Sequence, residues 1–186
     1  MTWLPTVIVL AAGKGERFKA SGAGENKLQA LLCGRFVRDH VLAAVHASGL
    51  PWHVVERGHT AHLSNPGMGD SIACGVAATQ GAKGWLILPA DLPLIQAQTL
   101  LTIASALQQH EVVAPIYQGQ QGHPVGFGAS CGAALMELTG DQGARAVVWQ
   151  HPVFRLPVDD EGCVLDVDTG DALRLAEQKL QKRSQN

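Results

Sequence analysis

The sequence lacks any apolar run long enough to cross a membrane, and aromatic residues make up only 5% of it. Its first apolar run, residues 6–12, is far shorter than the ~18 residues that indicate a transmembrane helix. No basic segment precedes this run, as one would in a secretory signal peptide. We therefore expect a cytoplasmic protein without a membrane partner, whose core consists mainly of Val, Leu, Ile and Ala.

Closely spaced cysteines and histidines of the metal-binding kind are also missing. The four cysteines are widely separated and form no CxxC pair: Cys33, Cys74, Cys131 and Cys163. This spacing argues against a structural zinc site and against the disulfide framework of a small secreted protein. The eight histidines form no HExxH motif, so no catalytic zinc site is predicted either.

The chain has no overall excess of basic residues. Its net charge of −2 disfavours a nucleic-acid partner, because proteins that bind nucleic acids usually carry a basic surface. The charges are unevenly distributed, however. Residues 1–38 contain six basic and two acidic residues, whereas residues 159–171 contain six acidic and no basic ones. The basic end suits a small polyanion such as a triphosphate and the acidic segment suits a cation, with solvated surface as the alternative for both.

The order of the apolar segments predicts an α/β fold, and the length favours one domain over residues 1–186. Residues 6–11 form a continuous apolar, β-branched run, which is typical of a strand buried on both faces. Further strands are expected at residues 52–55, 85–88, 112–114, near Val125, 153–158 and 164–167, and helices at residues 37–48, 69–80, 96–109, 129–138, 143–150 and 170–182. Their alternation implies right-handed crossovers and a doubly wound, mostly parallel, Rossmann-like sheet.

Ligands of such sheets bind at the carboxyl ends of the strands, which here are followed by residues 12–27, 57–71 and 89–95. Gly13 and Gly15 allow the first of these loops to approach a ligand closely. Three of its four cationic residues could neutralise a phosphate chain: Lys14, Arg17 and Lys27. The loop is neither a Walker A motif nor a complete GxGxxG motif, and a tight turn without a ligand is the alternative.

Asp91 is the only charged residue between Lys83 and Glu111. A lone carboxylate in so apolar a stretch is costly to desolvate unless a cation or hydrogen bonds meet it. At the carboxyl end of a strand it is well placed to bind Mg²⁺ beside phosphates held by the first loop. Alternatively, it makes a turn or caps the helix expected near Gln96.

Leu-Ala-Ala-Gly-x-Gly-x-Arg-Phe at residues 10–18, followed by Lys27, resembles the signature of the nucleotidyltransferases of the sugar-nucleotide and molybdenum-cofactor type. Pro-Ala-Asp-Leu-Pro around Asp91 resembles the metal-binding element of the same superfamily. The resemblance implies the nucleotide-diphospho-sugar transferase type of fold, with the triphosphate held by the first loop. The nine residues between Arg17 and Lys27 make a longer spacer than the molybdenum-cofactor members usually have.

Four further segments follow in the order of that family. Residues 65–71 resemble the segment that holds the base and ribose, and Ser71 could cap the helix after it. Residues 122–124 and 140–145 resemble the Gly-His-Pro and Gly-Asp-x-Gly-Ala-Arg elements of molybdenum cofactor cytidylyltransferases, and residues 166–169 resemble their Asp-Ile-Asp-Thr element. Local explanations are open for each: a turn at His123, a surface ion pair at Arg145, and helix capping at Asp166 or Asp168.

By this resemblance, the chain is expected to transfer CMP from CTP, or a nucleotide from GTP, to molybdopterin with Mg²⁺ and release of pyrophosphate. The implied catalytic residues are Arg17, Lys27 and Asp91. The implied nucleotide-binding residues are Leu10, Ala11, Ala12, Gly13, Lys14, Gly15, Arg17, Lys27, Asn65, Gly69 and Ser71. The implied acceptor-binding residues are His123 and Arg145, and the implied metal ligands are Asp91, Asp166 and Asp168.

Two alternatives to this function are open from the sequence. The chain could transfer a nucleotide to a sugar phosphate or a polyol phosphate, because those branches share the first loop and Asp91. It could also be a non-catalytic nucleotide sensor, or a cofactor chaperone for a molybdenum enzyme. A molybdenum hydroxylase or its own chaperone is a possible protein partner.

Overall fold

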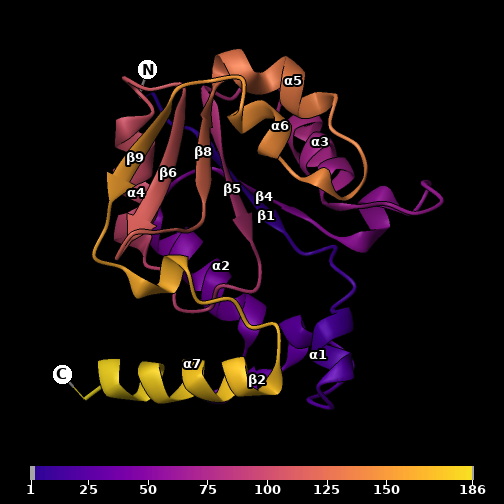
Figure 1. Cartoon of the computed structure of the whole chain (residues 1–186), viewed down its shortest axis with the longest axis vertical. Coiled ribbons are helices and arrows are strands. Elements are labelled where there is room, and N and C mark those ends of the chain that lie inside the picture. The colour runs from indigo at the N-terminus through magenta and orange to yellow at the C-terminus, as the bar shows by residue number, and fades with distance from the viewer. Residues whose placement is uncertain (1–2, 186) are drawn as a thin grey trace.

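The computed structural model describes residues 3–185, which form a seven-stranded mixed sheet between layers of helices (Figure 1). The strands lie in the order β4 (Trp52–Val55), β1 (Thr6–Leu10), β5 (Gly84–Pro89), β8 (Val125–Gly128), β6 (Val112–Tyr117) and β7 (Gln120–Gln121), and β9 (Val153–Pro157) pairs with β6. Strands β4, β1, β5, β6 and β9 share one direction, and β8 and β7 run opposite to it. The predicted doubly wound, mostly parallel α/β fold is confirmed.

Helices cover both faces of the sheet because side chains alternate along each buried strand. Val7, Val9, Leu86 and Leu88 point to one face, where they pack against helices α2 (Val37–Ser48) and α4 (Ala97–Ala106). Ile8 and the intervening residues of β5 point to the other face. There they pack against α3 (Met68–Ala78), α5 (Gly132–Met136) and α6 (Arg145–Val148). The continuous apolar pattern of β1 thus reflects burial on two sides, as the sequence predicted.

A third cluster of buried side chains lies beside the carboxyl end of the sheet. It joins helix α1 (Glu16–Ala20), the hairpin of β2 (Leu31–Leu32) and β3 (Arg35–Phe36), and the C-terminal helix α7 (Gly170–Arg183). Figure 1 shows α7 and α1 on the same side of the sheet, beyond the carboxyl ends of β1 and β5. Neither α1 nor the hairpin was predicted from the sequence.

The predicted strand at residues 164–167 is wrong. Only a short turn, Glu161–Cys163, precedes this segment, which then runs outside the sheet. Val167 is buried in the third cluster, and its amide donates to the carbonyl oxygen of Asp91 at 2.9 Å. The apolar pattern therefore reflects packing beneath the sheet edge rather than pairing within the sheet.

Helix α2 has the predicted bounds, and Gly49 directly after it has a φ of 67°, the left-handed conformation expected of a terminating glycine. Other boundaries differ from the expected ones in smaller ways. The helices predicted at residues 129–138 and 143–150 are shorter, reduced to α5 and α6. Ser71 lies inside α3 and does not cap it, since the helix begins at Met68. No helix between residues 3 and 185 combines the length and apolarity needed to cross a membrane.

Gly75 lets α3 approach the sheet closely, which gives a prediction about stability. An added Cβ would lie 2.5 Å from Cγ2 of Ile8 and 2.9 Å from Cγ2 of Val55. We expect Gly75→Ala to destabilise the protein by about 1–2 kcal/mol, because overpacking outweighs the gain in helix propensity. Urea unfolding measures the change. Gly58→Ala is the matched control, because no atom lies within 4 Å of that added Cβ, and an equal loss of stability there would refute the packing argument.

Candidate active site

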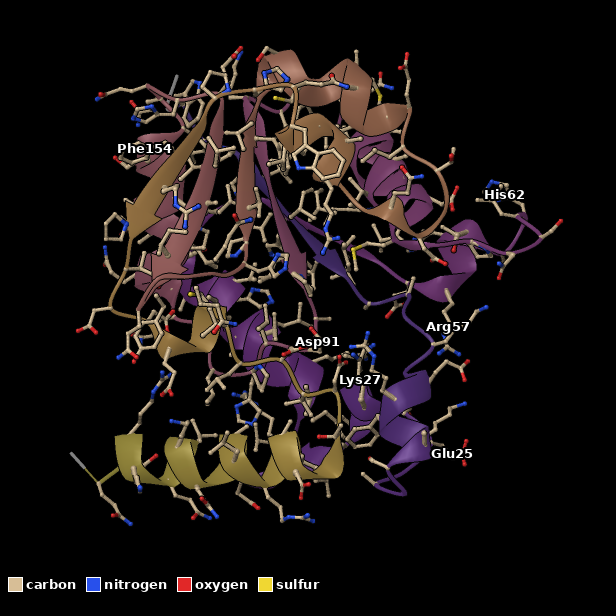
Figure 2. The ribbon with its side chains drawn as sticks, viewed as in Figure 1. Glu25, Lys27, Arg57, His62, Asp91 and Phe154 are labelled. Carbon is tan, nitrogen blue, oxygen red and sulfur yellow. The ribbon has the colours of Figure 1, made fainter. Side chains whose placement is uncertain are left out.

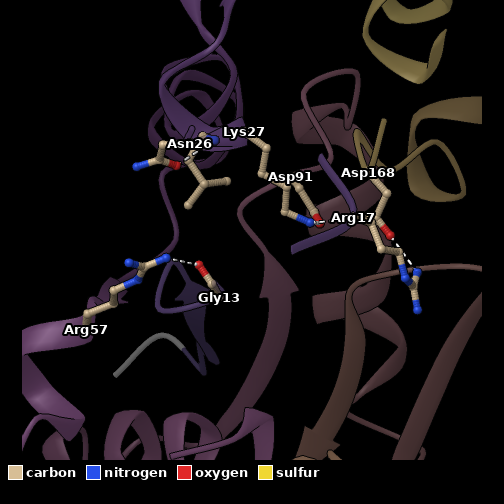
Figure 3. Close-up of polar contacts among 8 residues, drawn as sticks. Gly13, Arg17, Asn26, Lys27, Arg57, Asp91 and Asp168 are labelled. Carbon is tan, nitrogen blue, oxygen red and sulfur yellow. Dashed lines mark hydrogen bonds and ion pairs between the residues drawn. The ribbon is translucent and has the colours of Figure 1, made fainter. Parts of the chain in front are cut away.

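The first loop leaves β1 at the carboxyl edge of the sheet. Gly15 directly precedes α1 and has a φ of 66°, a left-handed conformation that glycine adopts without strain. The carbonyl oxygen of Gly13 accepts a hydrogen bond from the guanidinium of Arg57 at 2.9 Å (Figure 3). The Asn26 side chain accepts from the amide of Leu28 at 3.1 Å and starts the turn that presents Lys27. A long-range hydrogen bond thus holds the start of the loop, and a local one holds its end.

Lys27 lies between two carboxylates from distant parts of the chain. Its Nζ is 2.6 Å from Oδ2 of Asp91 and 2.5 Å from Oδ1 of Asp168. The other oxygen of Asp168 pairs with Arg17 at 2.8 Å (Figure 3). The side chains of Lys27 and Asp91 are only 14% and 15% exposed, whereas that of Arg17 is 81% exposed. Water therefore screens the attraction within the Lys27 pairs only slightly, whereas it weakens the attraction between Arg17 and Asp168.

The charges in this cluster shift one another's pKa values. Burial opposes the charge on Lys27, but the attraction and hydrogen bonds of Asp91 and Asp168 outweigh it, so its pKa is raised. Burial likewise opposes the charge on Asp168, but Lys27 and Arg17 outweigh it, so the pKa of Asp168 is lowered. Burial and then repulsion by Asp168 and Asp91 raise the pKa of Asp166. One carboxylate of the cluster thus lacks a cation to balance it.

Three carboxylates of this cluster could hold a divalent cation. One oxygen from each of Asp91, Asp166 and Asp168 lies within 4.8 Å of the others. In addition, Oδ1 of Asp91 is buried and has no hydrogen-bond partner within residues 3–185. Buried polar atoms normally have a partner, and carboxylate oxygens are the ligands that Mg²⁺ and similar cations prefer. The residues therefore fit a divalent cation.

A larger cavity of about 780 Å³ opens on one side of Lys27 and Asp91. Its lining includes seven of the residues implied in nucleotide binding: Leu10, Ala12, Gly13, Lys14, Lys27, Asn65 and Ser71. Nζ of Lys14 also donates to the Asn65 side chain at 3.1 Å, which links the first loop to the segment at residues 65–71. The volume and the mixed polar lining suit a ligand of nucleotide size.

A smaller cavity of about 540 Å³ opens on the other side of the same pair. Gly15, Arg17, His123 and the carboxylates of residues 166 and 168 line it. Lys27 and Asp91 line both cavities, so this ion pair forms a floor that the two cavities share. Figure 2 shows Lys27 and Asp91 close together beyond the sheet edge.

His123 is open to the smaller cavity, and its position is fixed through the main chain. The amide of His123 donates to the carbonyl oxygen of Cys163 at 2.8 Å. Desolvation lowers the pKa of the imidazole, although the charge of Asp91 opposes this shift. A neutral imidazole at this wall can both donate and accept a hydrogen bond.

Three of the implied residues line neither cavity. Ala11 donates its amide to Val55 at 2.8 Å and belongs to the sheet edge. Gly69 packs against the chain at residues 139–140, with the Thr139 oxygen 2.8 Å from where a Cβ would lie. Arg145 is exposed at the start of α6, and its side chain has no polar partner in the part of the chain that the structure describes. The structure thus brings His123, but not Arg145, to the smaller cavity.

The segment that carries Arg145 instead supports the larger cavity. One oxygen of Asp70 accepts from the amides of Gly67 at 2.8 Å and Gly140 at 2.9 Å, and Asp141 lines the cavity. The hydrogen bond from the Gly67 amide lowers the pKa of Asp70, and the bond from Gly140 adds to this shift against the opposing effect of burial. This segment therefore packs beside the larger cavity.

The sequence did not predict Arg57 as a residue of the site, nor Gln120 and Gln121, which form strand β7. Arg57 lines the larger cavity and holds the Gly13 carbonyl, and the two glutamines line the smaller cavity. The 57–71 loop was expected at this edge, which is a partial signal for Arg57. Nothing in the sequence marks the two glutamines, because β7 is a two-residue strand with no periodic pattern.

Known proteins resemble this chain in sequence and in structure. The family model of the MobA-like NTP transferase domain matches residues 7–154. The purine catabolism protein PucB of Bacillus subtilis (strain 168) is 29% identical to this chain, and the match covers 87% of this chain and 90% of PucB.

Solved structures extend the resemblance. Rv0371c of Mycobacterium tuberculosis H37Rv has a TM-score of 0.75 and 26% identity over 94% of this chain and 98% of its own. The structure of Rv0371c in complex with manganese has a TM-score of 0.73 and 25% identity, and it covers 94% of this chain and 98% of its own. Molybdopterin-guanine dinucleotide biosynthesis protein A of Archaeoglobus fulgidus has a TM-score of 0.67 and 17% identity, over 95% of this chain and 99% of its own. At this low identity the likeness shows the fold alone.

The family match covers most of the chain and includes the first loop, Lys27 and Asp91. The acidic pair before α7 lies beyond the matched residues but completes the same ion cluster. We conclude that the chain belongs to the MobA-like NTP transferase family of nucleotidyltransferases.

Proposed function

We propose that this protein transfers CMP from CTP to the phosphate of a molybdopterin-type acceptor with the help of Mg²⁺. The observation that carries this proposal is the arrangement of two cavities around a shared floor of Lys27 and Asp91. A nucleotide in the larger cavity and an acceptor in the smaller one would meet at this floor. In this proposal residues 1–186 act as one catalytic domain.

The proposed reaction needs no covalent bond to the protein. An oxygen of the acceptor phosphate forms a bond to the α-phosphorus of the nucleotide, and the bond from that phosphorus to the bridging oxygen of the β-phosphate breaks. The electron pair leaves with pyrophosphate. Alignment of the two phosphates and neutralisation of charge supply the catalysis. Lys27 is placed to neutralise the charge where the cavities meet, and Lys14 and Arg17 extend along either side.

Asp91, Asp166 and Asp168 would hold the divalent cation. A bound cation of this kind supplies charge neutralisation to phosphate oxygens. Such a site is supported by the buried Oδ1 of Asp91, which has no partner in the described part of the chain, and by the raised pKa of Asp166. The manganese complex of Rv0371c supports it as well. Mg²⁺ is proposed as the ion because it binds phosphates and carboxylates together in enzymes of this chemistry.

The choice of CTP rather than GTP, and of molybdopterin, rests on residues 122–124 and 140–145. These segments resemble those of molybdenum cofactor cytidylyltransferases, and the structure places the first at the smaller cavity and the second beside the larger one. We place the reaction in the cytoplasm, which suits four cysteines that are all free. A molybdenum hydroxylase or its chaperone is the proposed recipient of the product.

Measuring pyrophosphate release from CTP and GTP, with and without molybdopterin, tests the proposal. We expect release to require the acceptor and to be faster with CTP. Release with a sugar phosphate or a polyol phosphate but not with molybdopterin would favour the alternative transferases. Tight nucleotide binding without release under any condition would favour a nucleotide sensor or a cofactor chaperone.

His123 gives a prediction about the acceptor side. We expect His123→Ala to raise the KM for molybdopterin about tenfold, which corresponds to the loss of one or two hydrogen bonds, while the affinity for CTP stays the same. Steady-state kinetics and calorimetry measure the two quantities. Arg145→Ala serves as the comparison, because the structure keeps Arg145 out of the smaller cavity. A loss of CTP affinity in the His123 variant would contradict the proposed division of the cleft.

A further inference from the structure

The proposed metal ligands come from two segments that are far apart in the sequence. Asp91 follows β5, whereas Asp166 and Asp168 precede α7. Their spacing therefore depends on how residues 91–99 contact residues 160–168. We propose that Asp160 is a positioning residue that sets this spacing, an inference that rests on the proposed metal-dependent function.

Asp160 is a buried carboxylate that accepts hydrogen bonds from both segments. It is 2% exposed. Its Oδ2 accepts from the amide of Gln96 at 2.9 Å and from the hydroxyl of Thr99 at 2.7 Å. Its Oδ1 accepts from the amide of Gly162 at 2.9 Å and from the side-chain amide of Gln96 at 3.1 Å. One side chain thus fastens the start of α4 to the turn that leads to Asp166 and Asp168.

The hydrogen bonds explain why a carboxylate occupies this buried position. Four N–H or O–H groups point at the two oxygens, and Arg183 lies 3.6 Å from Oδ1. An asparagine would place its NH2 group against one set of these donors, whereas both oxygens of a carboxylate accept. Such charge-assisted hydrogen bonds are about twice as strong as neutral ones, which helps offset the cost of burial. Asp160 lines neither cavity, so it has no direct part in the proposed transfer.

Other contacts bind the same two segments along their length. The Val167 amide donates to the carbonyl oxygen of Asp91 at 2.9 Å. Gly162 lies so close to the backbone of Leu94 that a Cβ would have no room. From α7, Arg183 donates to the carbonyl oxygen of Leu94 at 2.8 Å. The two segments are therefore joined at both ends: by the hydrogen bonds of buried Asp160 at one end, and by the bond between Val167 and Asp91, beside the proposed metal ligands, at the other.

The alternative is that Asp160 only caps α4, since its first acceptor bond goes to Gln96, the residue before that helix. A cap alone would affect stability but not the distance between Asp91 and the acidic pair. The hydrogen bond from Gly162 gives Asp160 a role beyond capping α4, because this bond also orients the turn Glu161–Cys163 that leads to the acidic pair. A measurement of cation affinity therefore distinguishes the two roles.

The test compares Asp160→Asn with Asp159→Asn, the same change at the neighbouring exposed residue. Mn²⁺ binding is measured by electron paramagnetic resonance in the absence of nucleotide and acceptor. We expect Asp160→Asn to raise the Kd for Mn²⁺ about tenfold, and Asp159→Asn to leave it within twofold. In pyrophosphate release, the metal concentration for half-maximal rate should rise similarly, with kcat restored at saturating metal.

Thr99 provides a milder pair of variants in case Asp160→Asn does not fold. Thr99→Val removes one hydrogen bond to Asp160, and Thr99→Ser retains it. Only the valine variant should weaken Mn²⁺ binding. Lower thermal stability with unchanged Mn²⁺ affinity in the folded variants would overturn the positioning role and leave the proposed function standing. Absence of Mn²⁺ binding in the unaltered protein would overturn both.

Discussion

Asp91→Asn is expected to slow pyrophosphate release by about 100- to 1000-fold at saturating substrates, equivalent to roughly 3–4 kcal/mol of transition-state stabilisation. The reason is that Asp91 lies on the floor shared by both cavities and carries a buried oxygen that has no hydrogen-bond partner among the residues that the structure describes. An asparagine keeps the shape but removes the charge that the cation and Lys27 need. Steady-state kinetics over a range of Mg²⁺ concentrations measures the effect.

Asp159→Asn is the control for this variant, because Asp159 is exposed and lines neither cavity. Circular dichroism should show both variants folded. If Asp91→Asn kept a rate within a few fold of the unaltered protein at saturating Mg²⁺, Asp91 would be a structural residue. Its role in the proposed chemistry would then have to be abandoned.

Lys27→Met should have two opposite effects. It should lower kcat/KM for CTP by about 100-fold, since an ammonium group between the two cavities is lost. The same variant should bind Mn²⁺ several-fold more tightly without nucleotide, because Lys27 no longer competes for Asp91 and Asp168. Methionine has a similar length and no charge, so the cavity keeps its shape.

Kinetics and electron paramagnetic resonance measure these two effects separately. Lys27→Arg is the control, because it keeps a cation against both carboxylates and should not bind Mn²⁺ more tightly. A Lys27→Met variant that bound Mn²⁺ more weakly than the unaltered protein would mean that the ammonium does not compete with the cation. The inference that Lys27 and the divalent cation share Asp91 and Asp168 as partners would then be wrong.

The sequence predicted best the parts of the site that local chemistry determines. Asp91 could be identified because no other charge shares its apolar stretch. The long spacer before Lys27 did not displace it from the site: α1 takes up residues 16–20, and Gly22 and Gly24, with φ of 72° and 141°, turn the chain back. Lys27 then reaches Asp91 and Asp168, a meeting that depends on contacts 64 and 141 residues apart.

The sequence predicted less well what depends on tertiary packing. Residues 164–167 have the composition of a strand, yet the seven-stranded sheet is formed without them and Val167 is buried against another cluster. The sequence also showed no sign that Asp70 ties residue 140 to the larger cavity, which leaves Arg145 outside the smaller one; its acceptor role stays a prediction. A residue's place between two cavities is set by long-range contacts, which no local pattern in one sequence encodes.

Transfer of label from CTP tests the central claim most directly. The protein is incubated with molybdopterin, Mg²⁺ and CTP carrying radioactive phosphorus in either the α- or the γ-position. Bond formation at the α-phosphorus predicts that the α-label appears in the acceptor product and the γ-label in pyrophosphate, in equal amounts. An acceptor that stays unlabelled while CTP is bound, or label that reaches the acceptor from the γ-position, would contradict nucleotidyl transfer to this acceptor.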